Sequence, residues 1–195
     1  MHTPLFAVYL LEAGKTVHLP IKELMEKKVV LLIQCIVLCA IFTVLILPPQ
    51  FKNPLSQIAS YPPKIRERVK HLERYKDSLS QTQKRNVARK IAGALIAVII
   101  LAAMAYFSEK TRFVPAFIHV IILFLAVNLY DLLILDFIVF PNSKRVVIPG
   151  TEDMVSEYRN PMHHIKGALK GVAIGTAVAL LAGGLVEGFR YLTIL

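Results

Sequence analysis

The stretch FVPAFIHVIILFLAVNLYDLLILDFIVF, residues 113–140, decides the class of this protein. At about 1.5 Å per residue, a helix over this stretch is about 42 Å long, which exceeds the ~30 Å hydrocarbon core of a bilayer. Apolar stretches of such length are typical of membrane-spanning helices and rare in soluble domains. Residues 113–140 are therefore predicted to form a transmembrane helix that tilts or projects beyond the bilayer.

Three further apolar segments accompany it, at residues 29–47, 91–107 and 167–186. The first is predicted to end at Pro48–Pro49. Of the 195 residues, 55% are hydrophobic and only 18% are charged, whereas soluble domains hold about a quarter charged residues. This composition excludes a soluble globular domain and a disordered chain. The prediction is an all-α integral membrane protein with four transmembrane helices in a bundle, forming a single membrane domain.

The basic residues predict how the four spans are oriented. The chain has 23 Lys and Arg against 13 Asp and Glu, a net charge of +10. Sixteen of the 23 fall at residues 48–90 and 144–170, and seven on the opposite side of the predicted spans. Positive-inside reasoning places the loops 48–90 and 141–166 in the cytoplasm and both termini outside, with residues 1–28 as an interfacial segment. The excess charge is expected to face anionic lipid headgroups.

The loop at residues 48–90 contains a candidate basic amphipathic helix. In KIRERVKHLERYKDSL, residues 64–79, Ile65, Val69, Leu72 and Leu79 form a helical stripe among basic side chains. One interpretation is that this helix lies on the anionic leaflet of the membrane. The alternative, a helix packed on the protein's own loops, has equal support. A nucleic-acid partner is not predicted, because no aromatic interleaving or binding motif accompanies the charge.

The last apolar segment carries small residues at every fourth position. Gly167, Gly171, Gly175 and Gly183, with Ala179 between the last two, form an extended GxxxG stripe. Small residues let two membrane helices approach closely, so the stripe predicts tight helix packing. The partner is either another span, for which residues 91–107 offer a small face, or a second copy of the chain or another membrane protein.

Four polar residues interrupt the span at residues 113–140: His119, Asn128, Asp131 and Asp136. An ionisable group in a span costs at least ~2.5 kcal/mol on insertion scales and faces the bundle interior or a wet cavity by default. Asn128 and Asp131 share a helix face, while Asp136 lies about 140° around an α-helix from Asp131 and is expected nearer the interface. Three interpretations of these residues remain open: a structural hydrogen bond to a neighbouring helix, the handling of protons or cations, and contact with a substrate.

A second group of candidates lies in the loop at residues 141–166, where Glu152, Asp153, His163 and His164 are predicted to meet at the cytoplasmic surface. Adjacent histidines point to different faces of a helix, unlike the i, i+4 pair of zinc proteases. The spacing therefore predicts no metal site, and no motif predicts a cofactor. A plain solvated loop is the competing interpretation.

Two functions follow from these patterns. The first is a non-enzymatic, transporter-like or accessory membrane component with a polar pocket between the third and fourth spans. The alternative is a membrane-embedded enzyme that acts on a lipid or lipophilic substrate at the cytoplasmic interface. The chain contains no GxSxG, P-loop or GxGxxG motif, so the prediction leans away from an enzyme. Contact of His163 or His164 with Asp136 or Glu152 around a cavity would favour the enzyme.

Overall fold

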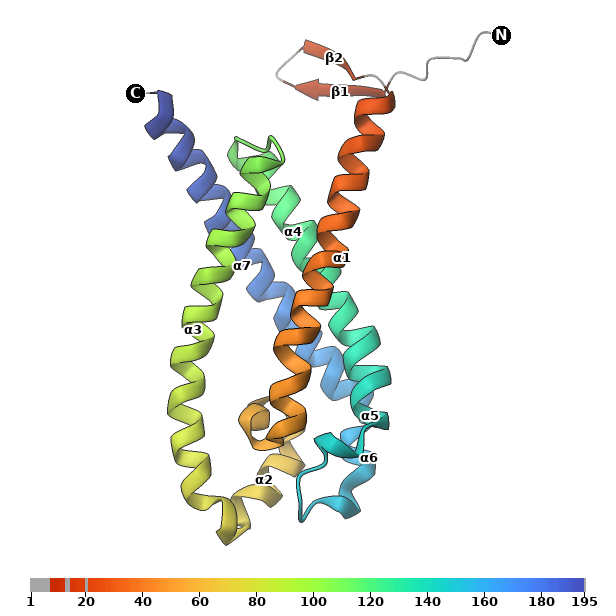
Figure 1. The fold of residues 1–195 in the computed structure, drawn as a ribbon, viewed down its shortest axis with the longest axis vertical. Coiled ribbons are helices and arrows are strands. Elements are labelled where there is room, and N and C mark those ends of the chain that lie inside the picture. Colours follow the sequence, from red (N-terminus) through yellow and green to blue (C-terminus); the bar gives the residue numbers. More distant parts are fainter. Residues whose placement is uncertain (1–7, 13–14, 20, 195) are drawn as a thin grey trace, which may run out of the picture.

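The computed structural model describes residues 8–12, 15–19 and 21–194 and is dominated by long helices (Figure 1). These are α1 (Ile21–Lys52), α3 (Lys76–Phe107), α4 (Phe113–Tyr130) and α7 (Pro161–Ile194). A π-helix, η3 (Asp131–Val139), and the short α5 (Phe140–Asn142) continue α4. The start of α1, the α3–α4 turn and the end of α7 lie at one end of the bundle, and α2, α5 and α6 lie at the other.

Short elements connect the long helices. Two strands precede α1 and pair antiparallel, with Val8 opposite Leu19: β1 (Val8–Glu12) and β2 (Lys15–Leu19). Between α1 and α3 lie the 3-10 helix η1 (Pro54–Ser60), α2 (Pro63–His71) and the 3-10 turn η2 (Glu73–Tyr75). Between α5 and α7 lie η4 (Lys144–Val146), η5 (Glu152–Met154) and α6 (Val155–Tyr158).

Three helices are long and apolar enough to cross a membrane: Ile21–Lys52, Phe113–Asn142 and Pro161–Thr193. The apolar part of α3, Ile91–Phe107, is shorter. In α1 no residue of the most apolar window is buried, and Leu32 and Val44 are 60% and 69% exposed. Large apolar side chains on this scale belong against lipid rather than water, which is consistent with an integral membrane protein.

A membrane core joins α3, α4 and α7 through small and branched apolar side chains. Its buried members are Val98, Leu101, Ala102, Ala105, Ala116, Val120, Leu123, Val178, Ala179, Ala182 and Val186. In a bilayer, where lipid tails are as apolar as these side chains, such helices are held by close packing rather than by expulsion from water.

The glycine stripe of α7 faces α4, the third apolar segment. A Cβ on Gly171 would collide with the Asn128 amide, and a Cβ on Gly175 would collide with the Phe124 ring. At Gly183 a Cβ would stand 3.1 Å from the Phe113 carbonyl oxygen. By contrast, Gly167 has open space beside it. The absence of side chains at three of these four glycines is what lets α7 approach α4.

The far end of α7 also anchors the start of α4. The Phe113 backbone N–H donates to Glu187 Oε2 at 2.7 Å, and the Arg190 guanidinium holds the same carboxylate at 2.5 Å. The first N–H groups of a helix have no partner within it, so Glu187 satisfies one of them from a neighbouring helix.

A second core lies outside the long helices, where the two connecting segments pack on each other. This loop core consists of Tyr61, Ile65, Val69, Ile148 and Tyr158. The Tyr61 hydroxyl donates to the Val146 carbonyl at 2.8 Å, and the Ile148 N–H donates to the Tyr158 hydroxyl at 3.0 Å. Burial raises the pKa of both tyrosine hydroxyls above its usual range. The segments at residues 48–90 and 141–166 thus form one folded unit.

The helices extend beyond the predicted spans, since α1 begins at Ile21 and α7 runs from Pro161 to Ile194. Two further differences concern the first connecting segment. First, α1 continues through Pro48 and Pro49 to Lys52. Each proline removes one N–H donor and crowds the carbonyl four residues earlier, which costs helix stability, and α1 ends three residues after Pro49. Second, the predicted amphipathic helix divides at Leu72, whose backbone is extended (φ −84°, ψ 110°). Leu79 consequently belongs to α3, which runs without a break into the apolar segment at residues 91–107.

The buried face of α2 points at the loop core. Ile65 and Val69 are fully buried against Tyr61, Ile148 and Tyr158. On the flanks of α2, the Lys64 ammonium pairs with Glu157 at 2.6 Å and the Arg68 guanidinium pairs with Asp153 at 2.9 Å. The apolar stripe of α2 is therefore covered by the protein's own loops, the second of the two alternatives that the sequence left open.

Candidate functional site

A polar cavity of about 640 Å³ opens at the loop end of the bundle, between the last turns of α1, the π-helix η3, the first turns of α7 and the start of α2. Its polar and charged lining residues are Gln50, Gln57, Ser60, Tyr61, Arg66, Asn128, Asp131, Asp136, Tyr158, His163, His164, Lys166 and Lys170. Four elements distant in sequence thus contribute titratable or hydrogen-bonding groups to one space.

The π-helix η3 sets the position of the two acids in this cavity. Residues five apart lie one above the other in a π-helix, because its hydrogen bonds run from i to i+5. Asp131 and Asp136 are five apart, and both line the cavity. The prediction that Asp136 lies about 140° around the helix from Asp131 assumed an α-helix and is wrong for this reason. Within α-helices, π-turns occur frequently at functional sites.

Asp136 forms a pair with His164 across the cavity wall. The two groups approach to 3.2 Å, between Asp136 Oδ1 and His164 Nδ1. His164 Nε2 lies 3.2 Å from the Tyr158 carbonyl oxygen, which only accepts hydrogen bonds. When the ring donates from Nε2 to that carbonyl, its contact with the carboxylate needs one more proton, carried either by the ring or by the acid. With that orientation, one proton lies between the ring and the carboxyl.

Asn128 and Asp131 differ in what they contact. The Asn128 amide donates to the Ala168 carbonyl oxygen of α7 at 3.1 Å and lies against Gly171. This bond links two helices, so the asparagine fills the structural role considered for it. In the part of the chain that the structure describes, the Asp131 carboxyl has no hydrogen-bond partner. It is the acid that remains available to a ligand.

Three basic side chains line the cavity without an acidic partner among the described residues: Arg66, Lys166 and Lys170. Arg66 is half-buried, and its Nε is buried with no hydrogen-bond partner. Its neighbours on α2, Lys64 and Arg68, are both paired with acids of the other loop. Arg66 is thus directed to the cavity while the charges beside it hold the two loops together.

Two of the predicted loop residues lie elsewhere. Glu152 accepts the Gly150 N–H at 2.8 Å, and this contact lowers the pKa of its carboxyl. It closes a turn in which Gly150 has a φ of +92°, a conformation that favours glycine. Asp153 is occupied by Arg68. His163 and His164, by contrast, both line the cavity. His163 Nε2 lies 2.8 Å from the Ser60 carbonyl oxygen.

The remaining predicted residues divide between the cavity and the core. Gly167 and Gly171 line the cavity, whereas Gly175 and Gly183 lie further along α7. His119 is 6% exposed within α4, and its Nε2 has no hydrogen-bond partner among the described residues. It does not line the polar cavity. No group of three or more metal-binding side chains occurs in the described ranges.

Sequence reasoning missed the basic wall of the cavity. From the sequence, Arg66, Lys166 and Lys170 belong to the basic excess expected to face anionic headgroups, because nothing in their spacing shows that the start of α2 and the first turns of α7 border one cavity. One signal was available. Lys166 and Lys170 are four apart, a spacing that places two side chains on one face of a helix.

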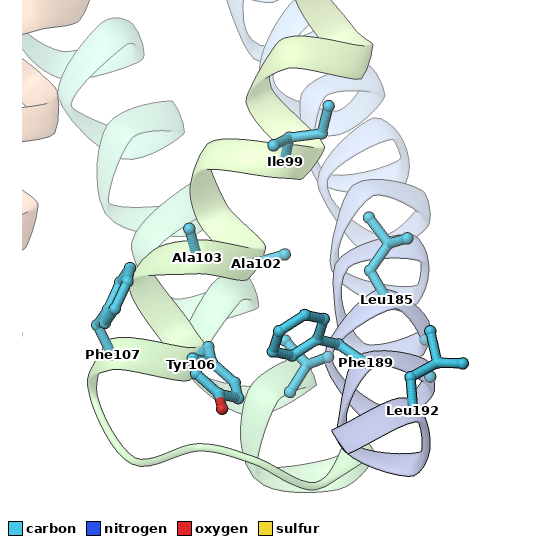
Figure 2. A pocket seen from close by; sticks show the side chains of 11 residues that line it. Ile99, Ala102, Ala103, Tyr106, Phe107, Leu185, Phe189 and Leu192 are labelled. Atoms are coloured by element: carbon cyan, nitrogen blue, oxygen red, sulfur yellow. The ribbon is translucent and has the colours of Figure 1, made fainter. Parts of the chain in front are cut away.

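A larger, apolar pocket of about 820 Å³ lies at the opposite end, between α3 and α7 (Figure 2). Figure 2 shows Tyr106 and Phe189 facing each other across it, and their rings pack edge to face with centroids 5.3 Å apart. Apart from the Tyr106 hydroxyl, its lining side chains carry no polar group. It therefore offers packing surface and no chemistry.

No family model, no curated protein and no solved structure matches the chain. The polar cavity is accordingly interpreted from its own residues.

Proposed function

We propose that the protein is a four-span integral membrane protein that binds a small ligand in the polar cavity, as a transporter-like or accessory component of its membrane. The observation that carries this proposal is the cavity itself, in which Asp131, the Asp136–His164 pair and three unpaired basic groups converge beside apolar helices. In a membrane protein, ionisable groups that face an internal cavity mark ligand or ion sites.

The fourth span in this proposal is the apolar part of α3. Ile91–Phe107 gives about 26 Å of helix, slightly less than the ~30 Å hydrocarbon core. Flanking basic side chains that extend to the headgroups make up such a difference. With four spans, both termini lie outside, and the polar cavity opens toward the cytoplasm, on the side with more basic residues.

The topology is tested by single cysteines on a background free of Cys35 and Cys39. Ser78→Cys and Ser156→Cys should react with an impermeant reagent only from the cytoplasmic face, and Glu109→Cys only from outside. All three positions are exposed. Reaction of Ser78→Cys and Glu109→Cys from the same face would show that α3 does not cross the membrane.

Ligand binding is tested by filling the cavity. Gly167 lines it with open space beside the backbone, so Gly167→Leu adds a side chain there without a clash at its Cβ. Gly184→Leu is the matched control, since Gly184 is equally open on the same helix but lines the apolar pocket. Native mass spectrometry should find a bound small molecule on the wild type and the control and none on Gly167→Leu. Equal occupancy of all three proteins would contradict binding in the polar cavity.

The second candidate function is a lipid-modifying enzyme, and the Asp136–His164 contact favours it. A carboxyl and an imidazole in contact beside a cavity are groups that general acid–base catalysis uses. Both ring nitrogens of His164 already have partners, so in this function the ring must release the Tyr158 carbonyl before Nε2 can reach a substrate. Glu152 and Asp153, which this alternative also required, are engaged elsewhere. Incubation of the purified protein with membrane lipids separates the two functions. A binding component returns its ligand unchanged, whereas an enzyme yields a product that His164→Gln does not form.

A further inference from the structure

We infer that the ligand of the polar cavity is an anionic amphiphile, a molecule with a phosphate or carboxylate head and an apolar tail, whose head is held by Arg66, Lys166 and Lys170. This inference rests on the proposed ligand-binding function and specifies the ligand's chemical class. Three observations support it: the charge of the cavity, its polarity gradient and the state of Arg66.

The charge of the cavity favours an anionic head. Apart from the tyrosines Tyr61 and Tyr158, its ionisable lining groups are Arg66, Lys166 and Lys170 on the basic side, Asp131 and Asp136 on the acidic side, and His163 and His164. Asp136 is paired with His164, which leaves three cations facing one unpaired acid. A group that carries one or two negative charges brings this set closer to neutrality. Arg66 is half-buried, so its charge gains most from an anionic partner, whereas Lys166 and Lys170 are exposed and attract an anion from the rim of the cavity.

The polarity of the cavity changes along two helices in the same direction. On α7, Lys166 and Lys170 give way to Ile174, and on α1, Gln50 gives way to Ile46 and Phe42. Each change extends over eight residues, or about 12 Å of helix. Because α1 runs toward the loop end and α7 runs away from it, both apolar ends lie on the membrane side (Figure 1). A free inorganic anion gains nothing from these apolar lining residues, whereas an acyl chain packs against them.

Arg66 is the group that identifies the head. Its guanidinium is half-buried beside the cavity, and its Nε is enclosed without a hydrogen-bond partner in the described part of the chain. An arginine without a partner for its fork of N–H groups suits the planar pairing that phosphate and carboxylate offer. Arg68, two residues further along α2, serves as the comparison, because its guanidinium is already paired with the Asp153 carboxylate.

The test is a titration of the purified full chain in detergent, followed by native mass spectrometry, with four probes. These are phosphatidylglycerol, phosphatidylcholine with the same acyl chains, oleate and inorganic phosphate. Phosphatidylglycerol or oleate should bind at least tenfold more tightly than phosphatidylcholine, and inorganic phosphate should not compete. A preference for the phospholipid over oleate identifies phosphate as the head, and the reverse identifies carboxylate.

Arg66→Gln should weaken binding of the preferred anionic lipid about tenfold, the effect of losing one hydrogen bond to a charged group. Arg68→Gln, the matched control, should leave binding unchanged. Equal binding of the two phospholipids, no effect of Arg66→Gln, or full competition by inorganic phosphate would each overturn the inference. If Gly167→Leu still blocks binding in those cases, ligand binding in the cavity stands and only the ligand class is wrong.

Discussion

In the membrane core, α7 lies against α4 through glycine and alanine, and only a few polar contacts, such as Asn128 with Ala168, join the two helices. In the loop core, by contrast, tyrosine hydroxyls bond to buried backbone groups around Ile65 and Val69. The first arrangement suits lipid, which gives apolar side chains no reason to associate. The second suits water, where burial of apolar area is favourable and buried polar groups need partners.

The comparison predicts that the two cores respond to different substitutions, and the largest effect is expected in the loop core. Ile65 is fully buried there, so Ile65→Ala leaves a cavity and should cost about 2–5 kcal/mol of the loop core's stability. Limited proteolysis should cut the connecting segments faster, and hydrogen exchange in α4 and α7 should stay unchanged. Equal loosening of α4 and α7 would show that the two cores unfold as one unit.

A smaller effect is expected when the membrane core is overfilled. Gly175→Ala places a methyl group against the Phe124 ring and should cost about 1–3 kcal/mol, seen as a lower melting temperature in detergent. Gly184→Ala is the control, because both changes share the helix-propensity gain of alanine and only the first meets a neighbour. If the two variants melt alike, α7 does not depend on its contact with Phe124.

Alkaline pH should weaken the loop core alone. Burial raises the pKa of Tyr61 and Tyr158 in the folded protein, while the unfolded chain ionises near pH 10. The unfolded state therefore loses protons first. Stability that is present below pH 10 falls as pH rises toward the folded pKa values, by up to about 1.4 kcal/mol per tyrosine for each pH unit.

The measurement is loop proteolysis between pH 8 and pH 11, compared with hydrogen exchange in α4 and α7. Tyr61→Phe and Tyr158→Phe should each flatten the pH dependence of proteolysis, because phenylalanine does not ionise. A pH dependence that both variants retain would show that other groups control the loop core.

The smallest effect is expected at the surface of the loop core. Lys64→Met and Arg68→Met each remove one exposed ion pair, to Glu157 or Asp153, and such pairs contribute about 0.2–1 kcal/mol. Raising the salt concentration should reproduce most of this loss in the wild type, since salt screens exposed charges. A loss as large as that of Ile65→Ala would mean that charge pairing, rather than burial, holds the loops together.

The sequence by itself determined the features that depend on a single segment. The long apolar stretches predicted helices for a bilayer because a chain in lipid must satisfy its own backbone hydrogen bonds. The fourfold spacing of small residues predicted close helix packing, since that spacing follows one helix face. Neither pattern shows which helix packs against which, and the structure shows that α4 packs against the glycines of α7.

Only the tertiary structure decided the cavity and the loop core. Asp136 and His164 are 28 residues apart, and Tyr61 lies 85 residues before Val146, so their contacts depend on how separate helices pack. The π-helix that brings Asp131 and Asp136 to one cavity changes the register of an apolar helix, and no residue pattern in the sequence marks it. Local propensity and hydropathy act within a few turns of helix, and these contacts arise from the balance of packing and hydrogen bonding across the whole bundle.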